Sequence, residues 1–271
     1  MLRPIGSMFK LYVLGAVVRG VEDGTLTWDQ ELTLTDEARS LPSGTLQDEP
    51  AGTTITARDA AAQMIAISDN TATDLLIDAV GRENVEDTLA EMGASAPSAN
   101  IPFLTTREMF QIGFSDPDLP ARWAEVSGLT GEVGDIEAPA DPAVDDAQRA
   151  LLAELPAWDL TLDPAAGATA FWPNGADWFA TAHDLCAAHV HLQRLAGTEA
   201  GEPVRDILSA NPGVELPEAE YVAFKGGSSI GEIGGSWYVE RPDGAREVLV
   251  MLTGGGDAAA VPDAGWLMGV A

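Results

Sequence analysis

The sequence predicts an α/β (α+β) fold, in which an antiparallel sheet is flanked by helices and lies beside a mainly helical subdomain. Up to Leu208, apolar residues recur at helical spacing in several segments, which are separated by residues typical of helix ends. From Tyr221 the pattern changes to β-rich segments joined by glycine turns. The chain has 271 residues and is 46% hydrophobic, which suffices for one sizeable core or two packed subdomains.

The first predicted element is a buried helix with Ser7 in its first turn. Gly20 is expected to end this helix. A short strand over residues 31–34 follows, and then a loop over residues 40–53 that is rich in proline and glycine. The helix itself is predicted from apolar side chains at helical spacing after Gly6, namely Phe9, Tyr12, Val13, Ala16 and Val17.

Three helices are predicted between residues 56 and 93. Thr56 is a favourable N-cap, with an acidic residue three positions later, for a helix that reaches Ile67. A second helix covers residues 71–80, so Ser68-Asp69-Asn70 occupies the break between the two. The third covers residues 82–92 and ends at Gly93.

The rest of the chain alternates irregular and regular segments. Thr105 begins a helix that fades near Gly113, and residues 115–146 lack periodicity, which indicates an inserted, lid-like loop. Residues 156–177 are expected to be irregular. Further helices are predicted at residues 147–155, 181–195 and 204–208, and strands at residues 221–225, 235–240 and 248–253. Three strands in succession favour an antiparallel sheet.

Composition excludes several classes of function. The net charge of −29, from 43 acidic and 14 basic residues, repels phosphates, so we expect no nucleic-acid partner. The longest apolar stretches, such as residues 11–18, are too short to span a membrane. Cys186 is the single cysteine, which rules out an internal disulfide. His183, His189 and His191 do not share one helical face, so we expect no metal and no cofactor, and we expect a monomer.

The chain contains two lysines, and each lies in a short pattern that suits hydrolase chemistry. Lys10 closes Ser7-Met8-Phe9-Lys10, and Lys225 opens Lys225-Gly226-Gly227-Ser228. Every other cationic side chain is an arginine. Arginine stays protonated, whereas a desolvated lysine can release its proton near neutral pH. The two retained amines therefore suggest proton transfer.

These residues can supply what acyl transfer needs. On a helix, residues three apart lie on one face, so Lys10 can act as a base toward the Ser7 hydroxyl. Ser68 and Asn70 lie at a helix break, where their side chains can enter a cleft. The glycines after Lys225 let a substrate backbone come close to the strand, while the lysine and Ser228 can hold a carboxylate.

In sequence order, S-x-x-K, S-D-N and K-(T/G)-G resemble the active-site signature of class A β-lactamases and penicillin-binding proteins. The spacing of 61 residues between Ser7 and Ser68 is similar to that of class A members. The resemblance covers most of the chain except an insertion over about residues 115–178. It implies a β-lactamase/transpeptidase-like fold with a sheet-containing subdomain (1–53 and 203–271), a helical subdomain (54–202) and an active site at the seam.

The resemblance also implies roles for individual residues. Ser7 is the acylated nucleophile, Lys10 its base partner and Ser68 a proton relay. The implied substrate is a β-lactam, or a peptide or ester near a carboxylate. The residues implied to bind it are Asn70, Lys225, Gly227, Ser228 and Ser229, and the oxyanion hole is formed by the N–H groups of Ser7 and of a strand residue near Ser229.

Two features depart from the family pattern. Class A enzymes activate the deacylating water with the glutamate of an E-x-x-L-N loop. Residues 93–104, which precede Thr105-Thr106, contain no acid, and the acids before Thr181 (Asp159, Asp163 and Asp177) lack the accompanying Asn and Leu. The family's first helix and leading strands also lie upstream of S-x-x-K. We therefore expect additional sequence before Met1 in a longer product, which would be exported or in the cell envelope.

Three alternatives stay open. One is a DD-peptidase or esterase without useful β-lactam turnover, which the missing glutamate favours. Another is a glutaminase-like enzyme, because that family shares S-x-x-K. The third is a non-catalytic relative that binds peptidoglycan.

Overall fold

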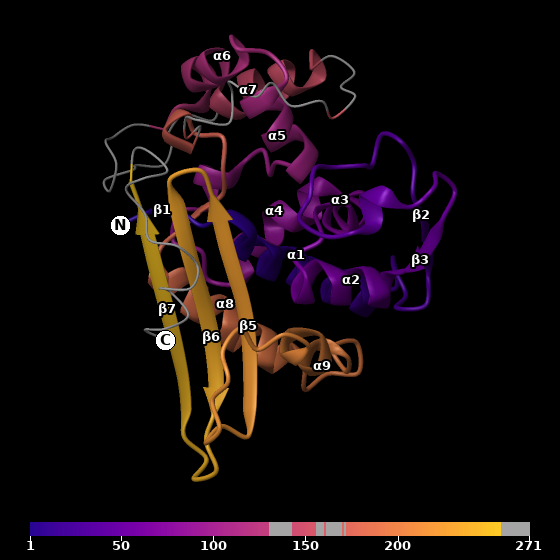
Figure 1. Cartoon of the computed structure of the whole chain (residues 1–271), viewed down its shortest axis with the longest axis vertical. Coiled ribbons are helices and arrows are strands. Elements are labelled where there is room, and N and C mark those ends of the chain that lie inside the picture. The colour runs from indigo at the N-terminus through magenta and orange to yellow at the C-terminus, as the bar shows by residue number, and fades with distance from the viewer. Residues whose placement is uncertain (130–142, 156–159, 161–169, 171, 256–271) are drawn as a thin grey trace.

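A computed structural model describes residues 1–129, 143–155, 160, 170 and 172–255 of the protein. A three-stranded antiparallel sheet in the order β5-β6-β7 forms one side of it (Figure 1). Its strands are β5 (Tyr221–Ser229), β6 (Glu232–Glu240) and β7 (Arg246–Gly254). The predicted antiparallel sheet is confirmed. Each strand is longer than predicted, and in β5 the pairing with β6 continues through glycine and serine residues (226–229), which have low β-propensity of their own.

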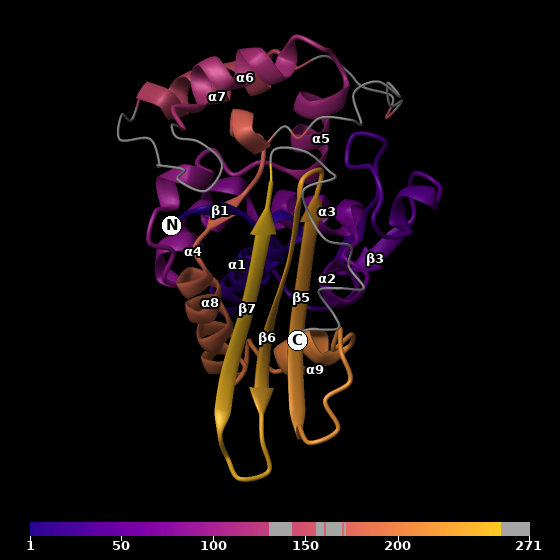
Figure 2. The same ribbon diagram turned by 60° about the vertical axis from the view of Figure 1, so that its left-hand side comes forward.

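The helices of the described residues largely follow the predicted order. Their bounds are α1 (Lys10–Glu22), α2 (Ala57–Ala66), α3 (Asn70–Val80), α4 (Arg82–Glu91), α5 (Thr106–Phe114), α6 (Leu119–Ser127), α7 (Ala143–Ala153), α8 (Ala182–Leu195) and α9 (Val204–Ser209). Helix α8 packs against β6 and β7, and α9 packs against β5 (Figure 2). The sheet and the helices that surround α1 therefore share one packed interior.

Helix α1 lies at the centre of the core. Its side chains from Lys10 to Val18 are buried, and it contacts α3, α4 and α8. Gly15 lies at a close approach to the end of α4, because a Cβ there would lie 2.3 Å from the sulfur of Met92. Burial of each large apolar side chain contributes about 1.5–3 kcal/mol. The burial of α1 therefore fixes the position of its first turn, which carries Lys10.

Two short ribbons tie distant segments together. Strand β1 (Arg3–Pro4) pairs with β4 (Phe179–Ala180), and β2 (Glu31–Thr33) pairs with β3 (Thr54–Thr56). The β1–β4 ribbon joins the residues just before Ser7 to the segment that follows the predicted insertion. It therefore fixes the approach of the chain to α1.

Helix α6 corrects the prediction of a continuous irregular loop over residues 115–146. Pro120 occupies the first turn of this helix, where its missing N–H costs nothing. Leu119 and Trp123 are four residues apart and both are buried, which is a helical signal. The surrounding prolines and acids obscured it. The acidic part of the predicted loop at residues 130–142, and most of residues 156–177, lie outside the described residues.

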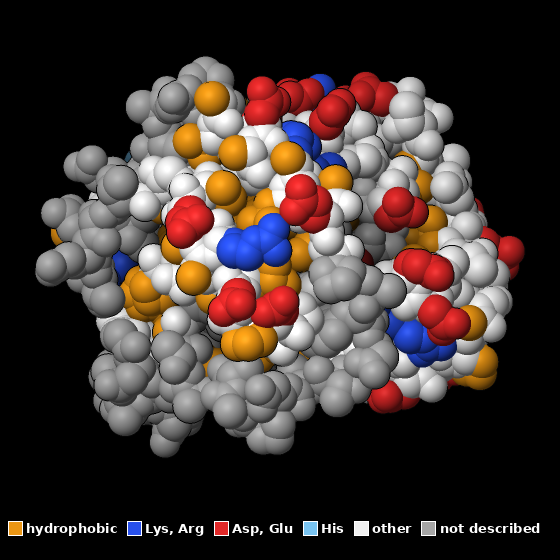
Figure 3. Space-filling model, turned by 90° about the horizontal axis from the view of Figure 1, so that it is seen from above, with side chains coloured by type: hydrophobic (Ala, Val, Ile, Leu, Met, Phe, Trp, Pro, Cys, Tyr) orange, Lys and Arg blue, Asp and Glu red, His pale blue; other side chains and the backbone are white. Residues whose placement is uncertain are grey.

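None of the described helices is long and apolar enough to cross a membrane. Figure 3 looks onto the end of the molecule that carries α6 and α7 and shows acidic side chains spread over it among apolar and a few basic ones. The negative charge is thus dispersed on this face. The division into subdomains at residues 53 and 203 stays a prediction.

Candidate active site

A cavity of about 620 Å³ lies where the start of α1, the α2–α3 break and β5 meet. Three of its walls come from segments far apart in sequence. Of the site residues predicted from sequence, Lys10 is buried beneath the cavity floor, with 0% of its surface exposed. The others all line the cavity: Ser7, Ser68, Asn70, Lys225, Gly227, Ser228 and Ser229.

Ser7 lies in a 3-10 turn, Gly6–Phe9, that leads directly into α1. Gly6 has φ +45°, a left-handed conformation that glycine adopts without a Cβ penalty. This turn places the Ser7 Oγ 3.3 Å from the Lys10 Nζ. The predicted pairing of hydroxyl and amine is present, although Ser7 precedes the α-helix instead of lying within it.

Lys10 is surrounded by acceptors. Its Nζ donates to the Ser68 carbonyl oxygen and to the Asn70 Oδ1, both at 2.6 Å, and lies 3.0 Å from the Ser68 Oγ. Burial lowers the pKa of Lys10 well below its ordinary value, and the charge of Lys225 lowers it further, against the opposing effect of Asp74 and Asp69. A neutral amine has two hydrogens for the two short contacts and a lone pair left to accept the Ser7 proton.

Ser68 stands in the break between α2 and α3 with φ +57°, a conformation that is uncommon for a residue with a side chain. Asp69 stabilises this break, because its Oδ1 caps α3 through the Ala72 N–H at 2.8 Å and its Oδ2 accepts the N–H groups of Thr45 and Leu46. Asp69 therefore ties the loop at residues 44–46 to the start of α3. The Ser68 hydroxyl is thereby directed toward both lysines.

Lys225 is 3% exposed and extends from β5 into the site. Its Nζ lies 3.0 Å from the Ser68 Oγ and donates to the Gly226 carbonyl oxygen at 2.7 Å. Burial lowers the pKa of Lys225 to about 7. The Ser68 hydroxyl therefore lies between two amines, each at 3.0 Å, which is an arrangement suited to passing a proton.

The strand β5 approaches the Ser7 turn so closely that only glycine fits at residue 227. A Cβ on Gly227 would lie 2.1 Å from the Ile5 carbonyl oxygen and 3.0 Å from the Ser7 nitrogen. A Cβ on Gly6 would lie 2.9 Å from the Ser228 nitrogen. Two backbone amides, those of Ser7 and Ser228, thus flank the seam between turn and strand, where an oxyanion would need donors.

One cavity wall is apolar and comes from α5, which contributes Met109, Phe110 and Phe114. The rings of Phe110 and Phe114 stack with their centroids 5.9 Å apart. With Ile67 and Ile230 from other segments, this wall suits an apolar substituent on a substrate.

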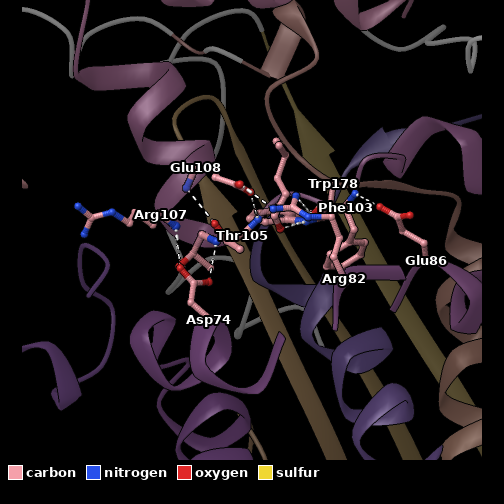
Figure 4. A network of polar contacts seen from close by, with 10 residues as sticks. Asp74, Arg82, Glu86, Phe103, Thr105, Arg107, Glu108 and Trp178 are labelled. Atoms are coloured by element: carbon pink, nitrogen blue, oxygen red, sulfur yellow. Dashed lines mark hydrogen bonds and ion pairs between the residues drawn. The ribbon is translucent and has the colours of Figure 1, made fainter. Parts of the chain in front are cut away.

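A polar network fixes the start of α5 (Figure 4). Asp74 accepts the N–H groups of Thr106 at 2.7 Å and Arg107 at 2.9 Å, and burial raises its pKa to about 7. Thr105 and Glu108 form a capping box at the same helix end. The apolar wall is therefore anchored to α3, the helix that also carries Asn70.

The same network holds the segment that precedes α5. Arg82 pairs with Glu108 at 2.6 Å and donates to the Phe103 carbonyl oxygen, while the Phe103 N–H donates to Glu86 (Figure 4). Residues 93–104 contain no acid, and none of them lines the cavity. The segment in which the sequence pattern would place a deacylating glutamate therefore lacks an acid and is set apart from the cavity.

Asp177 is the carboxyl group that lines the cavity in the described part of the chain. Its Oδ1 accepts the N–H groups of Gly6 at 3.2 Å and Trp178 at 2.7 Å. Sequence reasoning considered Asp177 but set it aside because the motif around it did not match, and it missed the neighbouring Glu232. No local pattern connects these two acids, since the β1–β4 ribbon and β6 bring them together. Asp159 and Asp163 lie outside the described residues.

No group of three or more potential metal ligands is found among the described residues. His189 is buried and its Nε2 lies 3.0 Å from the Ser236 Oγ, which in turn donates to the Lys225 carbonyl oxygen. His183, His191 and Cys186 instead line a separate, smaller hollow beside α8. The histidines thus do not converge on one point.

The chain matches the family described as Beta-lactamase enzyme family over residues 2–258. A PBP-A mutant, solved as an acyl-enzyme complex with penicillin G, is similar with a TM-score of 0.63 and 19% identity, over 99% of this chain and 78% of that chain. The β-lactamase from Sphaerobacter thermophilus has a TM-score of 0.61 and 21% identity, over 99% and 80% of the two chains. The class A β-lactamase from Mycobacterium abscessus has a TM-score of 0.60 and 17% identity, over 99% and 82%.

No curated protein matches the chain significantly. At these identities the structural similarities establish the fold, which is the predicted β-lactamase/transpeptidase-like arrangement.

Proposed function

The chain belongs to the beta-lactamase enzyme family, and we propose on this premise that it is a serine hydrolase that acts through an acyl-Ser7 intermediate. The substrate is an amide or ester that carries a nearby carboxylate, and β-lactams are the first candidates. The observation that carries the proposal is the position of the Lys10 Nζ, which lies within 3.3 Å of the oxygens of Ser7, Ser68 and Asn70.

In the acylation step, the Ser7 Oγ attacks the carbonyl carbon and its proton passes to the neutral amine of Lys10. The N–H groups of Ser7 and Ser228 stabilise the negative charge that forms on the carbonyl oxygen. As the carbon–nitrogen or carbon–oxygen bond breaks, the Ser68 hydroxyl gives its proton to the leaving atom. A lysine ammonium beside Ser68 replaces that proton, so the charge stays balanced within the site.

Lys225 supplies the carboxylate anchor in this proposal. A burial-lowered pKa of about 7 means that the free site holds the ammonium only part of the time at neutral pH. An incoming carboxylate favours the charged form, and Ser228 can add a hydrogen bond. Asn70 orients the substrate amide while it accepts from Lys10. The apolar wall of α5 receives the acyl substituent.

A related candidate is a DD-peptidase or esterase that is acylated by β-lactams but releases them slowly. This candidate is favoured by the absence of any acid in residues 93–104. Deacylation needs a base for the attacking water, and that base sets how fast the ester on Ser7 is hydrolysed. The two candidates share the acylation step and differ in the step that follows.

Kinetics with a chromogenic cephalosporin and with an ester of a D-alanyl-D-alanine peptide separate these possibilities. A burst of one product per enzyme followed by steady turnover of the cephalosporin indicates a β-lactamase. A burst with no turnover, together with turnover of the ester, indicates the DD-peptidase or esterase. The absence of both a burst and Ser7-dependent turnover with either compound contradicts an acyl-Ser7 mechanism. Ser7→Ala is the matched control, because it removes only the nucleophilic oxygen.

A further inference from the structure

Two buried carboxyl groups lie beneath the Ser7 turn, and the acylation chemistry does not use either of them. Asp177, just before β4, and Glu232, the first residue of β6, are each 3% exposed. A Cβ on Gly6 would lie 2.8 Å from the Glu232 Oε1, and the Gly6 N–H donates to the Asp177 Oδ1. Both acids thus touch the residue that precedes the nucleophile.

The remaining oxygens of the pair lack donors. The Asp177 Oδ2 and both Glu232 oxygens are buried without a hydrogen-bond partner from any other described N–H or O–H group. The two carboxyl groups face each other, so a proton placed between them satisfies both. Two adjacent buried carboxylates without that proton would carry an uncompensated double charge.

We propose that Asp177 and Glu232 form a carboxyl pair that shares a proton and positions the Ser7 turn for acylation. This inference rests on the proposed acyl-Ser7 function. Asp177 accepts two backbone N–H groups and therefore holds the charge, whereas Glu232 accepts none and holds the proton. A charged acceptor makes a stronger hydrogen bond to the Gly6 N–H than a neutral one. Both are positioning residues, because they act through the backbone of the turn.

The residue after Asp177 also packs against the Ser7 turn. Trp178 stacks on Phe9, the last residue of the Ser7 turn, with ring centroids 3.6 Å apart. The Trp178 carbonyl oxygen accepts the Ile5 N–H at 2.9 Å, so Trp178 contacts the chain both before and at the end of the Ser7 turn. Loss of the Asp177 charge weakens its hydrogen bond to the Gly6 N–H, next to the nucleophile, while the contacts of Trp178 with Phe9 and Ile5 remain.

The charges that face the pair come from few groups. Burial is the main cause that raises the pKa of Glu232, and the charge of Asp177 raises it further. Burial is also the main cause that raises the pKa of Asp177 to about 7. On the neighbouring turn and strand, Lys10 and Lys225 direct their side-chain nitrogens to Ser68. Asp177 therefore gains its proton as the pH falls through about 7, and the acylation rate falls with it.

The test compares the pH profile of acylation in four proteins, with benzylpenicillin as the probe and intact mass as the readout. Glu232→Leu removes the protonated carboxyl that donates to the Asp177 carboxylate, so the pKa of Asp177 rises and the acid limb is expected to move up by about one pH unit or more. Asp177→Asn keeps an oxygen that accepts the Gly6 N–H but has no group that titrates, so the acid limb disappears. Because the acceptor is now neutral and the hydrogen bond weaker, the acylation rate at pH 8 falls roughly three- to tenfold. Glu247→Gln, on the adjacent strand β7, removes an exposed carboxyl group far from the pair and should leave the profile unchanged.

Thermal unfolding gives a second readout that needs no activity. A carboxyl group whose pKa is raised in the folded protein stabilises the fold fully at pH values below its ordinary pKa. That stabilisation is lost as the pH rises from the ordinary pKa through the pKa of the folded state. The Tm of Glu232→Gln minus that of the wild type should therefore increase between about pH 4 and pH 8, while Glu247→Gln shows no such trend. If the acylation profile of Glu232→Leu coincides with that of the wild type and Glu232→Gln shows no Tm trend, the inference is wrong. A wild type that neither forms an adduct nor hydrolyses benzylpenicillin contradicts the proposed function and the positioning role together. The Tm profile then still decides whether the proton is shared.

Discussion

The Nζ of Lys10 lies 2.6 Å from the Oδ1 of Asn70, and both groups are buried. This contact, with the equally short one to the Ser68 carbonyl oxygen, uses two hydrogens of the Lys10 amine. The remaining position of the nitrogen faces the Ser7 hydroxyl at 3.3 Å. The pair therefore determines which way the lone pair of a neutral Lys10 points.

Replacing Lys10 by methionine keeps most of the side-chain volume and removes the base. General-base catalysis contributes about 10²–10⁴-fold, so the acylation rate of Lys10→Met should fall by that factor. Burying an apolar group in place of an amine should keep the fold, and the Tm serves as the control. An acylation rate within threefold of the wild type contradicts the role of Lys10.

Asn70→Asp places an anion against the same amine. An opposite charge within hydrogen-bond distance favours the charged form, so the pKa of Lys10 rises. Acylation at pH 7 should then decrease and recover as the pH is raised. Asn70→Leu, which removes the acceptor without adding charge, should lower the rate with no upward shift of the acid limb. Equal pH profiles for the two variants would contradict this electrostatic explanation.

Lys225 gives a stability prediction whose sign follows from its lowered pKa. The unfolded chain holds the Lys225 proton up to about pH 10, whereas the folded protein releases it near pH 7. Burying the amine therefore costs stability at low pH, and that cost diminishes as the pH rises between these values. Lys225→Met should be more stable than the wild type near pH 6, and its advantage should shrink toward pH 10. Urea unfolding at both pH values measures this difference, and a constant difference contradicts it.

Gly227 and Gly226 offer a matched comparison within β5. A Cβ at residue 227 meets the rigid backbone of Ile5 and the Ser7 turn, whereas one at residue 226 mainly meets the movable ring of Phe224 at 3.0 Å. Gly227→Ala should lower the free energy of unfolding by about 1–3 kcal/mol and displace the turn, which abolishes acylation. Gly226→Ala should cost less. Denaturant titration and the adduct assay test both effects, and equal costs would contradict the close approach.

The elements that rest on local pattern were predictable from the sequence. The Thr56 cap and the start of α8 are local signals, and each appears where it was predicted. The break between α2 and α3 covers residues 67–69, one residue earlier than predicted, so Asn70 is the first residue of α3. The site residues could be predicted because S-x-x-K, S-D-N and K-(T/G)-G occur in the same order as in the family signature. Their convergence on one cavity depends on long-range packing of α1 against α3 and of β5 against the Ser7 turn.

The features that sequence reasoning missed depend on tertiary contact. Glu232 shows no motif, and its burial opposite Asp177 follows from the meeting of β6 with the segment before β4. The apolar wall of α5 is also invisible locally, because Phe110 and Phe114 could equally have faced the core. Helix α6 carried a helical signal, but it was masked by a composition typical of loops.

Peptide mapping of the protein after exposure to benzylpenicillin tests the central claim most directly. The account predicts one adduct, on the peptide that contains Ser7, and none in Ser7→Ala. An adduct on Ser68 or another residue, or neither an adduct nor Ser7-dependent hydrolysis of benzylpenicillin by the folded wild type, would contradict it.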